Sequence, residues 1–194
     1  MRKATLVLTC LLLISSTAWA AVTMRTDPSF TGRPAPAEDG SNTCPPGVTI
    51  SSATPVGSYM DSGTTCGFTN TLTSYSGACG LPFPYGGEDS IYELPLGPGN
   101  LVDFSMDLTG STGDLVLFLL GTCGNGTSCV TNSQDAIGIG AGPEVIDPAN
   151  YPAGTYYLYV DSYYDAGTTG SCGSYTLTVN GNPFPVELME FTID

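Results

Sequence analysis

The feature that most restricts this chain is the absence of positive charge from most of its length. All four basic residues, Arg2, Lys3, Arg25 and Arg33, precede Pro34, whereas 17 of the 18 acidic residues follow it. The chain contains no histidine, so no salt bridge between side chains can form within the part after Pro34. The fold of that part must therefore rest on apolar packing, hydrogen bonds and covalent cross-links.

This charge distribution also excludes several classes of function. Phosphate backbones require Lys or Arg to displace counter-ions, and anionic membranes require basic clusters, so we expect neither nucleic acid nor charged lipid as a partner. The absence of histidine excludes Ser-His-Asp and Cys-His nucleophilic mechanisms and zinc sites of the histidine type. A purely acidic surface instead favours divalent cations or neutral ligands.

The first 20 residues have the pattern of a secretory signal peptide. Arg2 and Lys3 precede an apolar run over residues 4–14, and an Ala-Trp-Ala sequence ends at Ala20, where signal peptidase requires small residues. The apolar run is shorter than the roughly 20 residues that span a bilayer. The sequence predicts cleavage after Ala20 and a secreted protein, extracellular or periplasmic, that does not insert into a membrane.

Six cysteines remain after this cleavage, and their even number in an exported chain predicts three disulfides. A metal-thiolate site is the alternative, but no two of these cysteines have the Cys-x2-Cys spacing typical of zinc. Connectivity does not follow from the count, since six cysteines allow about 15 patterns. Spacing favours short rings around polar loops, and the expected pairs are then Cys123–Cys129, Cys66–Cys79 and Cys44–Cys172.

The mature chain divides into a leader, a folded part and a tail. Residues 21–43 are rich in Pro, Gly and Ser and lack apolar periodicity, which indicates a flexible leader. Residues 44–181 consist of short β-branched and aromatic runs separated by turn residues, without a helical repeat. The last residues, 182–194, place apolar side chains on one face of an extended chain, which favours an edge strand or a docking tail.

The folded part is predicted to be all-β. Residues 101–108 alternate apolar and polar side chains, as in a strand with one buried face, whereas residues 115–120 are apolar on both faces and indicate a central, covered strand. Between them, residues 109–113 are expected to form a hairpin loop. The predicted strands are 54–60, 68–74, 90–94, 101–108, 114–120, 144–147, 155–161 and 174–179. About eight short antiparallel strands suggest two packed sheets.

Five segments of the folded part carry a recognisable pattern. They are DSGTTCGFTN (61–70), GEDSIY (87–92), GDLVLFL (113–119), AGTYYLYVD (153–161) and GSYTL (173–177). In this order they resemble the bacterial pre-peptidase C-terminal domain family over about residues 44–181. The resemblance implies a jelly-roll-like β-sandwich, here with disulfide-stapled loops, which usually accompanies secreted enzymes and has no catalytic residues of its own. Related collagen-binding modules of bacterial collagenases imply roles for calcium and surface tyrosines.

Calcium suits the acidic residues of the loops, because Ca²⁺ prefers hard oxygen ligands such as carboxylates and backbone carbonyls. Glu88 and Asp89 are adjacent in a Gly-rich loop, and Asp114 follows Gly113. We therefore expect Glu88, Asp89 and Asp114 to be ligands of a structural calcium ion. The alternative is that these acids are solvated and cap turns.

The densest aromatic cluster lies at residues 156–164. Tyr157 and Tyr159 share one face of the expected strand, and Tyr163 follows in the next turn. If that face is exposed, the tyrosines form a flat, amphipathic surface that suits sugars or extended protein chains. Cross-strand packing of the tyrosines is the alternative. Tyr157, Tyr159 and Tyr163 are the binding residues that the sequence predicts.

These observations favour a secreted, non-catalytic binding or accessory module, stabilised by calcium, whose partner is an extracellular protein or polysaccharide. One alternative is a structural subunit that assembles through its C-terminal strand. Another is a hydrolase that uses carboxylates alone. The Asp-Ser-Gly-Thr-Thr sequence at 61–65 matches an aspartic-protease pattern but occurs once. We therefore expect a turn in which Asp61 bonds backbone amides and Gly63 has a positive φ.

Overall fold

The computed structural model describes residues 40–50, 58–80, 83–98, 100–133 and 138–182. All of them belong to one compact unit, Ala35–Asp194. The predicted signal peptide, most of the leader and the tail beyond Asn182 lie outside the described residues, so these assignments stay predictions. In the described part of the chain, no helix is long and apolar enough to cross a membrane.

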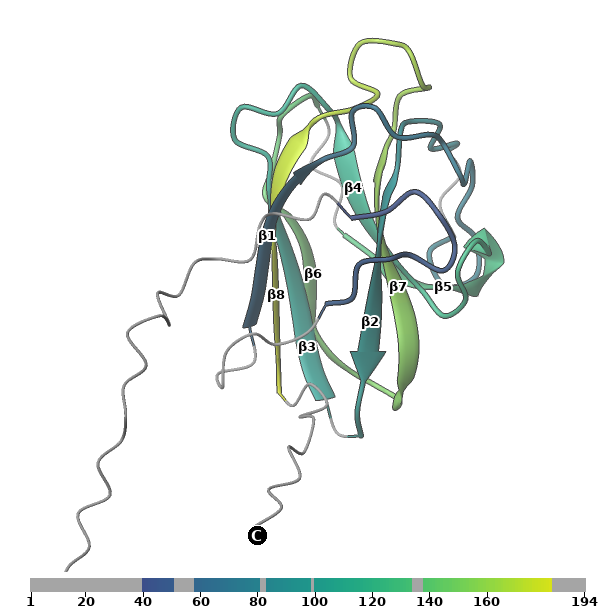
Figure 1. Cartoon of the computed structure of the whole chain (residues 1–194), viewed down its shortest axis with the longest axis vertical. Helices are drawn as coiled ribbons and strands as arrows, with labels where there is room; N and C mark the ends of the chain where they lie inside the picture. Colours follow the sequence, from purple (N-terminus) through teal and green to yellow (C-terminus); the bar gives the residue numbers. More distant parts are fainter. Residues whose placement is uncertain (1–39, 51–57, 81–82, 99, 134–137, 183–194) are drawn as a thin grey trace, which may run out of the picture. The chain divides into compact units, whose positions relative to one another are not determined.

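The described residues form two antiparallel sheets of four strands each (Figure 1). The elements are β1 (Ser58–Thr64), β2 (Ser90–Leu96), β3 (Asn100–Asp107), β4 (Leu115–Leu120), the 3-10 helix η1 (Gly126–Ser128), β5 (Cys129–Asn132), β6 (Glu144–Tyr151), β7 (Gly154–Ser162) and β8 (Ser174–Asn182). One sheet has the order β1-β8-β3-β6 and the other β2-β7-β4-β5. Pairing of β1 with β8, β2 with β7, β3 with β6 and β4 with β5 is the winding of a jelly roll, so the predicted fold class is confirmed.

The main core lies between the two sheets. Along β3, Val102, Phe104 and Met106 are buried while Leu101 is 50% exposed, as the alternation in the sequence predicts. Leu117 of β4 and Leu158 of β7 belong to the same buried cluster from the opposite sheet. Because this part of the chain has no basic residue, removal of apolar surface from water is the dominant stabilising term.

A second core lies on the outer face of the β2-β7-β4-β5 sheet. The segment between β1 and β2, described over residues 65–80 and 83–89, packs on this face, and we call it the cover segment. Tyr75 stacks on Phe118 of β4 with ring centroids 3.7 Å apart, and Tyr85 meets the same ring edge-on at 4.8 Å. Every residue of β4 is consequently buried, which confirms the predicted covered strand.

The predicted strand at 68–74 is wrong, because these residues belong to the cover segment and form no strand. A segment that crosses over the face of a sheet cannot share its hydrogen-bond ladder. The expected hairpin at 109–113 is also wrong. Since β3 and β4 lie in different sheets, this loop connects the two layers of the sandwich. β1 is described over Ser58–Thr64, so it continues past the predicted end at residue 60, and residues 54–57 of the predicted strand lie outside the described part.

The Asp-Ser-Gly-Thr-Thr sequence lies mostly in β1, so the predicted turn is wrong. Asp61 is opposite Leu177 of β8 and is 6% exposed, and its carboxylate accepts a hydrogen bond from the Tyr92 hydroxyl at 2.9 Å. Gly63 does not have a positive φ. It lacks a side chain because a Cβ would lie 2.7 Å from the Tyr175 hydroxyl. Asp61 is therefore a structural carboxylate and cannot form a protease dyad with a second copy.

Residues 40–50 run along the edge of β2. Ser41 and Ile91 exchange two backbone hydrogen bonds of 3.0 and 2.7 Å, and Thr49 forms a parallel bridge with Glu93. The sheet contacts thus begin before Cys44, within the residues that the sequence assigns to the leader. These contacts satisfy backbone N–H and C=O groups at the edge of β2 that could otherwise pair with a strand of another chain.

The six cysteines form three disulfides, as predicted, but the three expected pairs are wrong. The bonds are Cys44–Cys123, Cys66–Cys172 and Cys79–Cys129. Thr64 at the end of β1 is opposite Ser174 at the start of β8, so cysteines just outside these two residues meet. Proximity in sequence favours short rings, whereas the winding of the jelly roll brings distant cysteines together.

Peptide mapping should distinguish the two patterns. After pepsin digestion of the unfolded, unreduced protein at acid pH, Cys123 and Cys129 should stay on one peptide, because only Gly, Asn, Thr and Ser separate them. That peptide should be linked to two others, one that contains Cys44 and one that contains Cys79. Mass spectrometry that finds a closed ring within the peptide would contradict the structure.

Candidate functional site

A shallow groove with aromatic walls opens at the loop between β7 and β8. It is lined by Pro84, Tyr163, Tyr164, Asp165, Thr168 and Thr169. Its volume is about 490 Å³. Phe83 lies beside it, with its ring centroid 5.8 Å from that of Tyr163, and we call these seven residues the aromatic groove. Phe83 is 51% exposed, and Tyr163 and Tyr164 are each 37% exposed, so three aromatic side chains face solvent at one place.

Backbone hydrogen bonds hold the loop that carries the groove. Tyr163 N donates to Asp114 O at 3.1 Å, and Ala166 N donates to Gly86 O at 2.6 Å. The second bond ties the loop to the end of the cover segment. Tyr85, buried below, contacts Tyr163 edge-on with ring centroids 6.0 Å apart. The groove is thus built from two segments, one before β2 and one after β7, that are fixed to each other.

The chemistry of the groove combines aromatic rings, hydroxyls and one carboxylate. Tyr163 and Tyr164 meet edge to face, with ring centroids 5.5 Å apart and an angle of 85°. The Thr168 hydroxyl donates to the Asp165 carbonyl at 2.6 Å, which shapes the loop. Tyrosine provides a large contact area at little conformational cost and keeps a polar end in water. Such a surface suits an extended, amphipathic polymer.

Of the three tyrosines predicted to bind a ligand, only Tyr163 lies at the groove. Tyr159 is fully buried in the second core, so its prediction as a binding residue is wrong. Its hydroxyl accepts a hydrogen bond from Gly124 N at 2.9 Å and lies 3.1 Å from Cys44 Sγ, and burial raises the pKa of Tyr159 to about 12. Tyr157 is half-buried against the same core. The tyrosines on this face of β7 therefore pack in the protein interior, which was the alternative to ligand binding, because the cover segment lies on this face.

Sequence reasoning missed the contribution of the cover segment to the groove. Phe83 and Pro84 lie about 80 positions before Tyr163, and no local pattern connects them. One signal was available: Phe83 stands between two prolines, which cannot donate to a sheet ladder and so place the aromatic residue in a loop. Where that loop packs is visible only in the folded protein.

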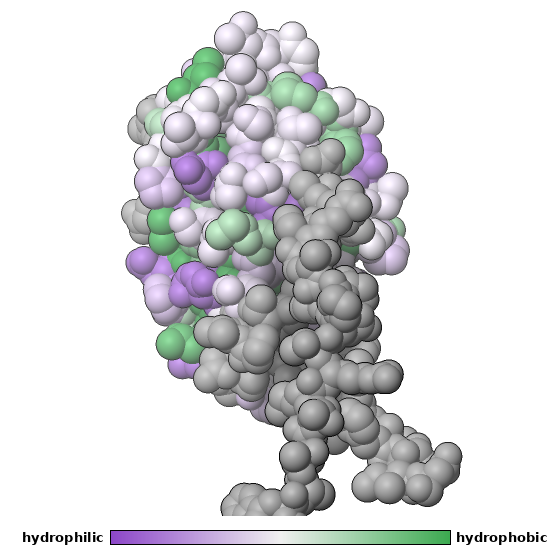
Figure 2. Space-filling model, turned by 60° about the vertical axis from the view of Figure 1, so that its left-hand side comes forward, coloured by the Kyte–Doolittle hydropathy of each residue, from purple (hydrophilic) through white to green (hydrophobic). Residues whose placement is uncertain are grey.

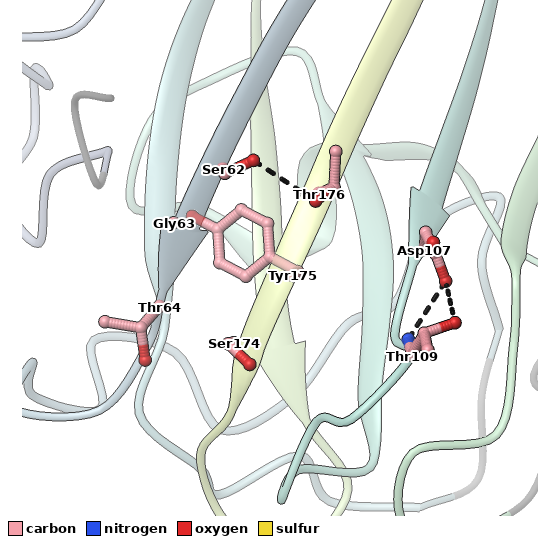
Figure 3. Close-up of a pocket in the computed structure, with 8 residues that line it drawn as sticks. All are labelled: Ser62, Gly63, Thr64, Asp107, Thr109, Ser174, Tyr175 and Thr176. Carbon is pink, nitrogen blue, oxygen red and sulfur yellow. Dashed lines mark hydrogen bonds between the residues drawn. The ribbon is translucent and has the colours of Figure 1, made fainter. Parts of the chain in front are cut away.

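A second groove, of about 330 Å³, lies on the other sheet and has the opposite character (Figure 3). It is lined by Ser62, Gly63, Thr64, Asp107, Thr109, Ser174, Tyr175 and Thr176. We call it the hydroxyl groove. Asp107 Oδ1 accepts hydrogen bonds from Thr109 Oγ1 at 2.7 Å and from Thr109 N at 2.9 Å, and these bonds lower the pKa of Asp107. Figure 2, with the β1 and β8 side of Figure 1 turned forward, shows mostly pale residues of intermediate hydropathy.

Two fully buried carboxylates anchor the cover segment, one at its own end and one on the sheet below it. Asp89 directly precedes β2, whose first residue Ser90 is opposite Val160 of β7, and Asp161 is the next residue of β7. Asp89 accepts hydrogen bonds from the backbone N–H groups of residues 71 and 72 at 2.9 and 3.1 Å, and Asp161 accepts one from the Tyr75 hydroxyl at 2.7 Å. Burial raises the pKa of both carboxyl groups, and the charge of Asp89 raises that of Asp161 further.

The three predicted calcium ligands are not brought together. In the described part of the chain, no group of three or more Asp, Glu, His or Cys side chains could hold a metal ion. Asp89 is bound by backbone amides, and Asp114 Oδ1 accepts a hydrogen bond from Gly138 N at 3.1 Å. Glu88 Oε2 and Asn70 Oδ1, in contrast, are buried and have no hydrogen-bond partner among the described residues. Of the predicted trio, Glu88 alone has a buried side-chain oxygen without a hydrogen-bond partner among the described residues.

No protein-family model and no curated protein matches the chain. Among solved structures, PliG from Aeromonas hydrophila, a periplasmic inhibitor of g-type lysozyme, is similar with a TM-score of 0.41 and 14% identity, over 70% of this chain and 95% of that one. The pre-peptidase C-terminal domain of a collagenase from Bacillus anthracis is similar with a TM-score of 0.39 and 16% identity, over 77% and 100% of the two chains. The second structure is of the family that the five sequence segments resemble.

The stability of the protein should decrease as the pH rises from acid to neutral. Unfolded Asp161 ionises near its ordinary pKa of 3.8, whereas burial keeps the folded carboxyl protonated to higher pH. A raised folded pKa means that the free energy of unfolding is greatest below about pH 4 and declines above it. Thermal melts from about pH 3 to 8 should show this decline, at about 2–4 °C per kcal/mol.

The variant Asp161→Asn, which cannot ionise, should make the decline of stability with pH less steep, while the surface variant Asp147→Asn should keep the wild-type slope. A wild-type melting temperature that rises between about pH 4 and 7 would contradict the assignment of Asp161 as a desolvated acid.

Proposed function

We propose that this protein is a secreted, non-catalytic accessory module that holds an extended extracellular polymer, protein or polysaccharide, in the aromatic groove. The observation that carries the proposal is the grouping of Phe83, Tyr163 and Tyr164. They are three of the six large apolar side chains that are exposed in the described part of the chain. Exposed apolar residues that gather at one place mark interaction sites, whereas scattered ones need no explanation.

The acids of the two grooves support a non-catalytic role. Glycoside hydrolysis by carboxylates needs two acidic side chains that flank the substrate. The aromatic groove is lined by one carboxylate, Asp165, and the hydroxyl groove by one, Asp107. Asp89 and Asp161 do lie close together, but they are fully buried and bonded to the cover segment. A substrate cannot reach them.

The three disulfides support export, because such bonds form and persist in oxidising compartments. They agree with the signal peptide that the sequence predicts, whose residues lie outside the described part. The proposed site of action is therefore the periplasm or the extracellular space.

Truncation of an exposed aromatic side chain should remove binding. The mature protein is tested for retention on gelatin, chitin and cellulose, and we expect at least one of these to retain it. Tyr164→Ala and Phe83→Ala should each weaken that retention about tenfold, the effect of removing a central aromatic anchor. Met60→Ala, which truncates a side chain 72% exposed on β1, is the matched control and should bind as wild type. Equal retention of all variants, or no retention of the wild type, would contradict the proposal.

Calcium binding is proposed for the buried oxygens of Glu88 and Asn70. Glu88 precedes Asp89 and Asn70 follows Thr69, and Asp89 N approaches Thr69 O at 3.5 Å, so the two residues adjoin one backbone contact. Ca²⁺ commonly completes its ligand set with backbone carbonyls and water. Calcium bound there would neutralise part of the acidic charge of the domain and secure the cover segment.

Calcium at about 100 times its Kd should then raise the free energy of unfolding by about 2.7 kcal/mol. The Glu88→Gln variant should lose this gain, measured as the shift in melting temperature between calcium and a chelator, while Asp107→Asn should keep it. A wild-type melting temperature that is the same with calcium and with chelator would exclude the site.

A further inference from the structure

We propose that the aromatic groove selects a polypeptide that carries Lys or Arg, with the positive charge paired to Asp165 and packed against Tyr163 and Tyr164. The inference rests on the proposed function, which makes the groove a binding site, and it names the class of ligand.

Asp165 is an exposed residue whose carboxylate lines the groove. Its backbone carbonyl accepts hydrogen bonds from Thr168 N at 3.1 Å and from Thr168 Oγ1 at 2.6 Å, so the residue is held in a turn. Its carboxylate accepts no hydrogen bond from any described residue. The side chain lies against Gly86, where a Cβ would collide with it. The carboxylate is thus fixed at the wall of a groove whose other lining side chains are uncharged.

The two tyrosines provide the surface on which a cation can pack. Their rings are nearly perpendicular, at 85°, with centroids 5.5 Å apart, so together they present both a ring face and a ring edge. A Lys or Arg side chain within about 6 Å of a ring centroid is attracted by the negative face of the ring. Arg suits such a site especially, because its planar guanidinium can stack on a ring and pair with a carboxylate at once.

The charge of the whole domain favours the same ligand. No basic residue follows Arg33, so no cation of the described part competes for Asp165, and the field of the acids attracts positive ligands. An anionic polymer would be repelled. A neutral sugar bound in the groove would displace water from the Asp165 carboxylate and supply no positive charge in its place. Such desolvation of an unpaired charge is unfavourable.

An extended polypeptide also matches the rest of the groove. Phe83 and Pro84 form an apolar end, while Thr168 and Thr169 carry hydroxyls that can bond to a peptide backbone. Side chains of an extended peptide alternate in direction, so one chain can place a basic residue at Asp165 and an apolar one near Phe83.

The experiment compares two synthetic peptides of equal length, one with Arg and one with Gln at the same positions, in fluorescence-polarisation titrations of the mature protein. We expect the wild type to bind the Arg peptide at least about tenfold more tightly than the Gln peptide. Asp165→Asn should remove this preference, and Asp165→Glu should keep most of it. Asp107→Asn changes the net charge by the same amount, but Asp107 lies in the hydroxyl groove. The affinity of this variant for the Arg peptide should therefore stay within about twofold of that of the wild type.

The outcomes separate this inference from the proposed function. Equal losses in Asp165→Asn and Asp107→Asn would show general electrostatic attraction and overturn the inference. If wild type binds the Gln peptide as well as the Arg peptide, or a neutral oligosaccharide more tightly, while Tyr164→Ala loses binding, the groove is the site but has no preference for cations. If Tyr164→Ala binds every probe as wild type does, both proposals fail. Melting curves show which variants are folded.

Discussion

Within the part of the chain after Pro34, buried carboxylates have to be stabilised without any positive charge. Five acidic residues are buried in the described part, and no Lys, Arg or His follows Arg33. Among the described residues, hydroxyls and amides donate hydrogen bonds to all five: Tyr92 to Asp61, Thr71 and Leu72 to Asp89, Gly138 to Asp114, Ser133 to Glu144, and Tyr75 to Asp161. Neutral donors compensate desolvation less fully than a counter-charge does, so burial raises the pKa of Asp89, Asp114 and Asp161.

The same bonds determine where the cover segment lies, and through it the aromatic groove. Asp161 of β7 holds Tyr75 of the segment against the β2-β7-β4-β5 sheet, and Asp89 at the end of the segment binds the backbone N–H groups of residues 71 and 72. The Cys79–Cys129 bond attaches the segment to the start of β5. Its last residues carry Phe83 to the loop after β7, where Tyr163 completes the aromatic wall. The candidate binding surface therefore depends on packing in the second core rather than on any strand of the sandwich.

Local patterns of apolar and polar residues predicted a strand correctly where the pattern alone decided the structure. β3 alternates and β4 is apolar on both faces, and each lies as its pattern predicts. The strand predicted at 68–74 has a suitable composition, but the face on which it packs offers side chains and not backbone groups. The tyrosines of β7 and of the loop after it illustrate the same limit, because Tyr159 and Tyr163 are four residues apart and yet one is buried and the other exposed.

By itself the sequence determined the fold class, the number of disulfides and the absence of ion pairs within the part after Pro34, since these follow from composition and from the two-residue repeat of a strand. Only the tertiary structure decided the cysteine pairs, the burial of Tyr159 and the assembly of the groove from Phe83 and Tyr163. Each of these depends on contacts between segments far apart in the chain. Such contacts are set by the order in which a jelly roll winds its strands and by which face a connecting segment covers, and neither leaves a periodic trace in the sequence.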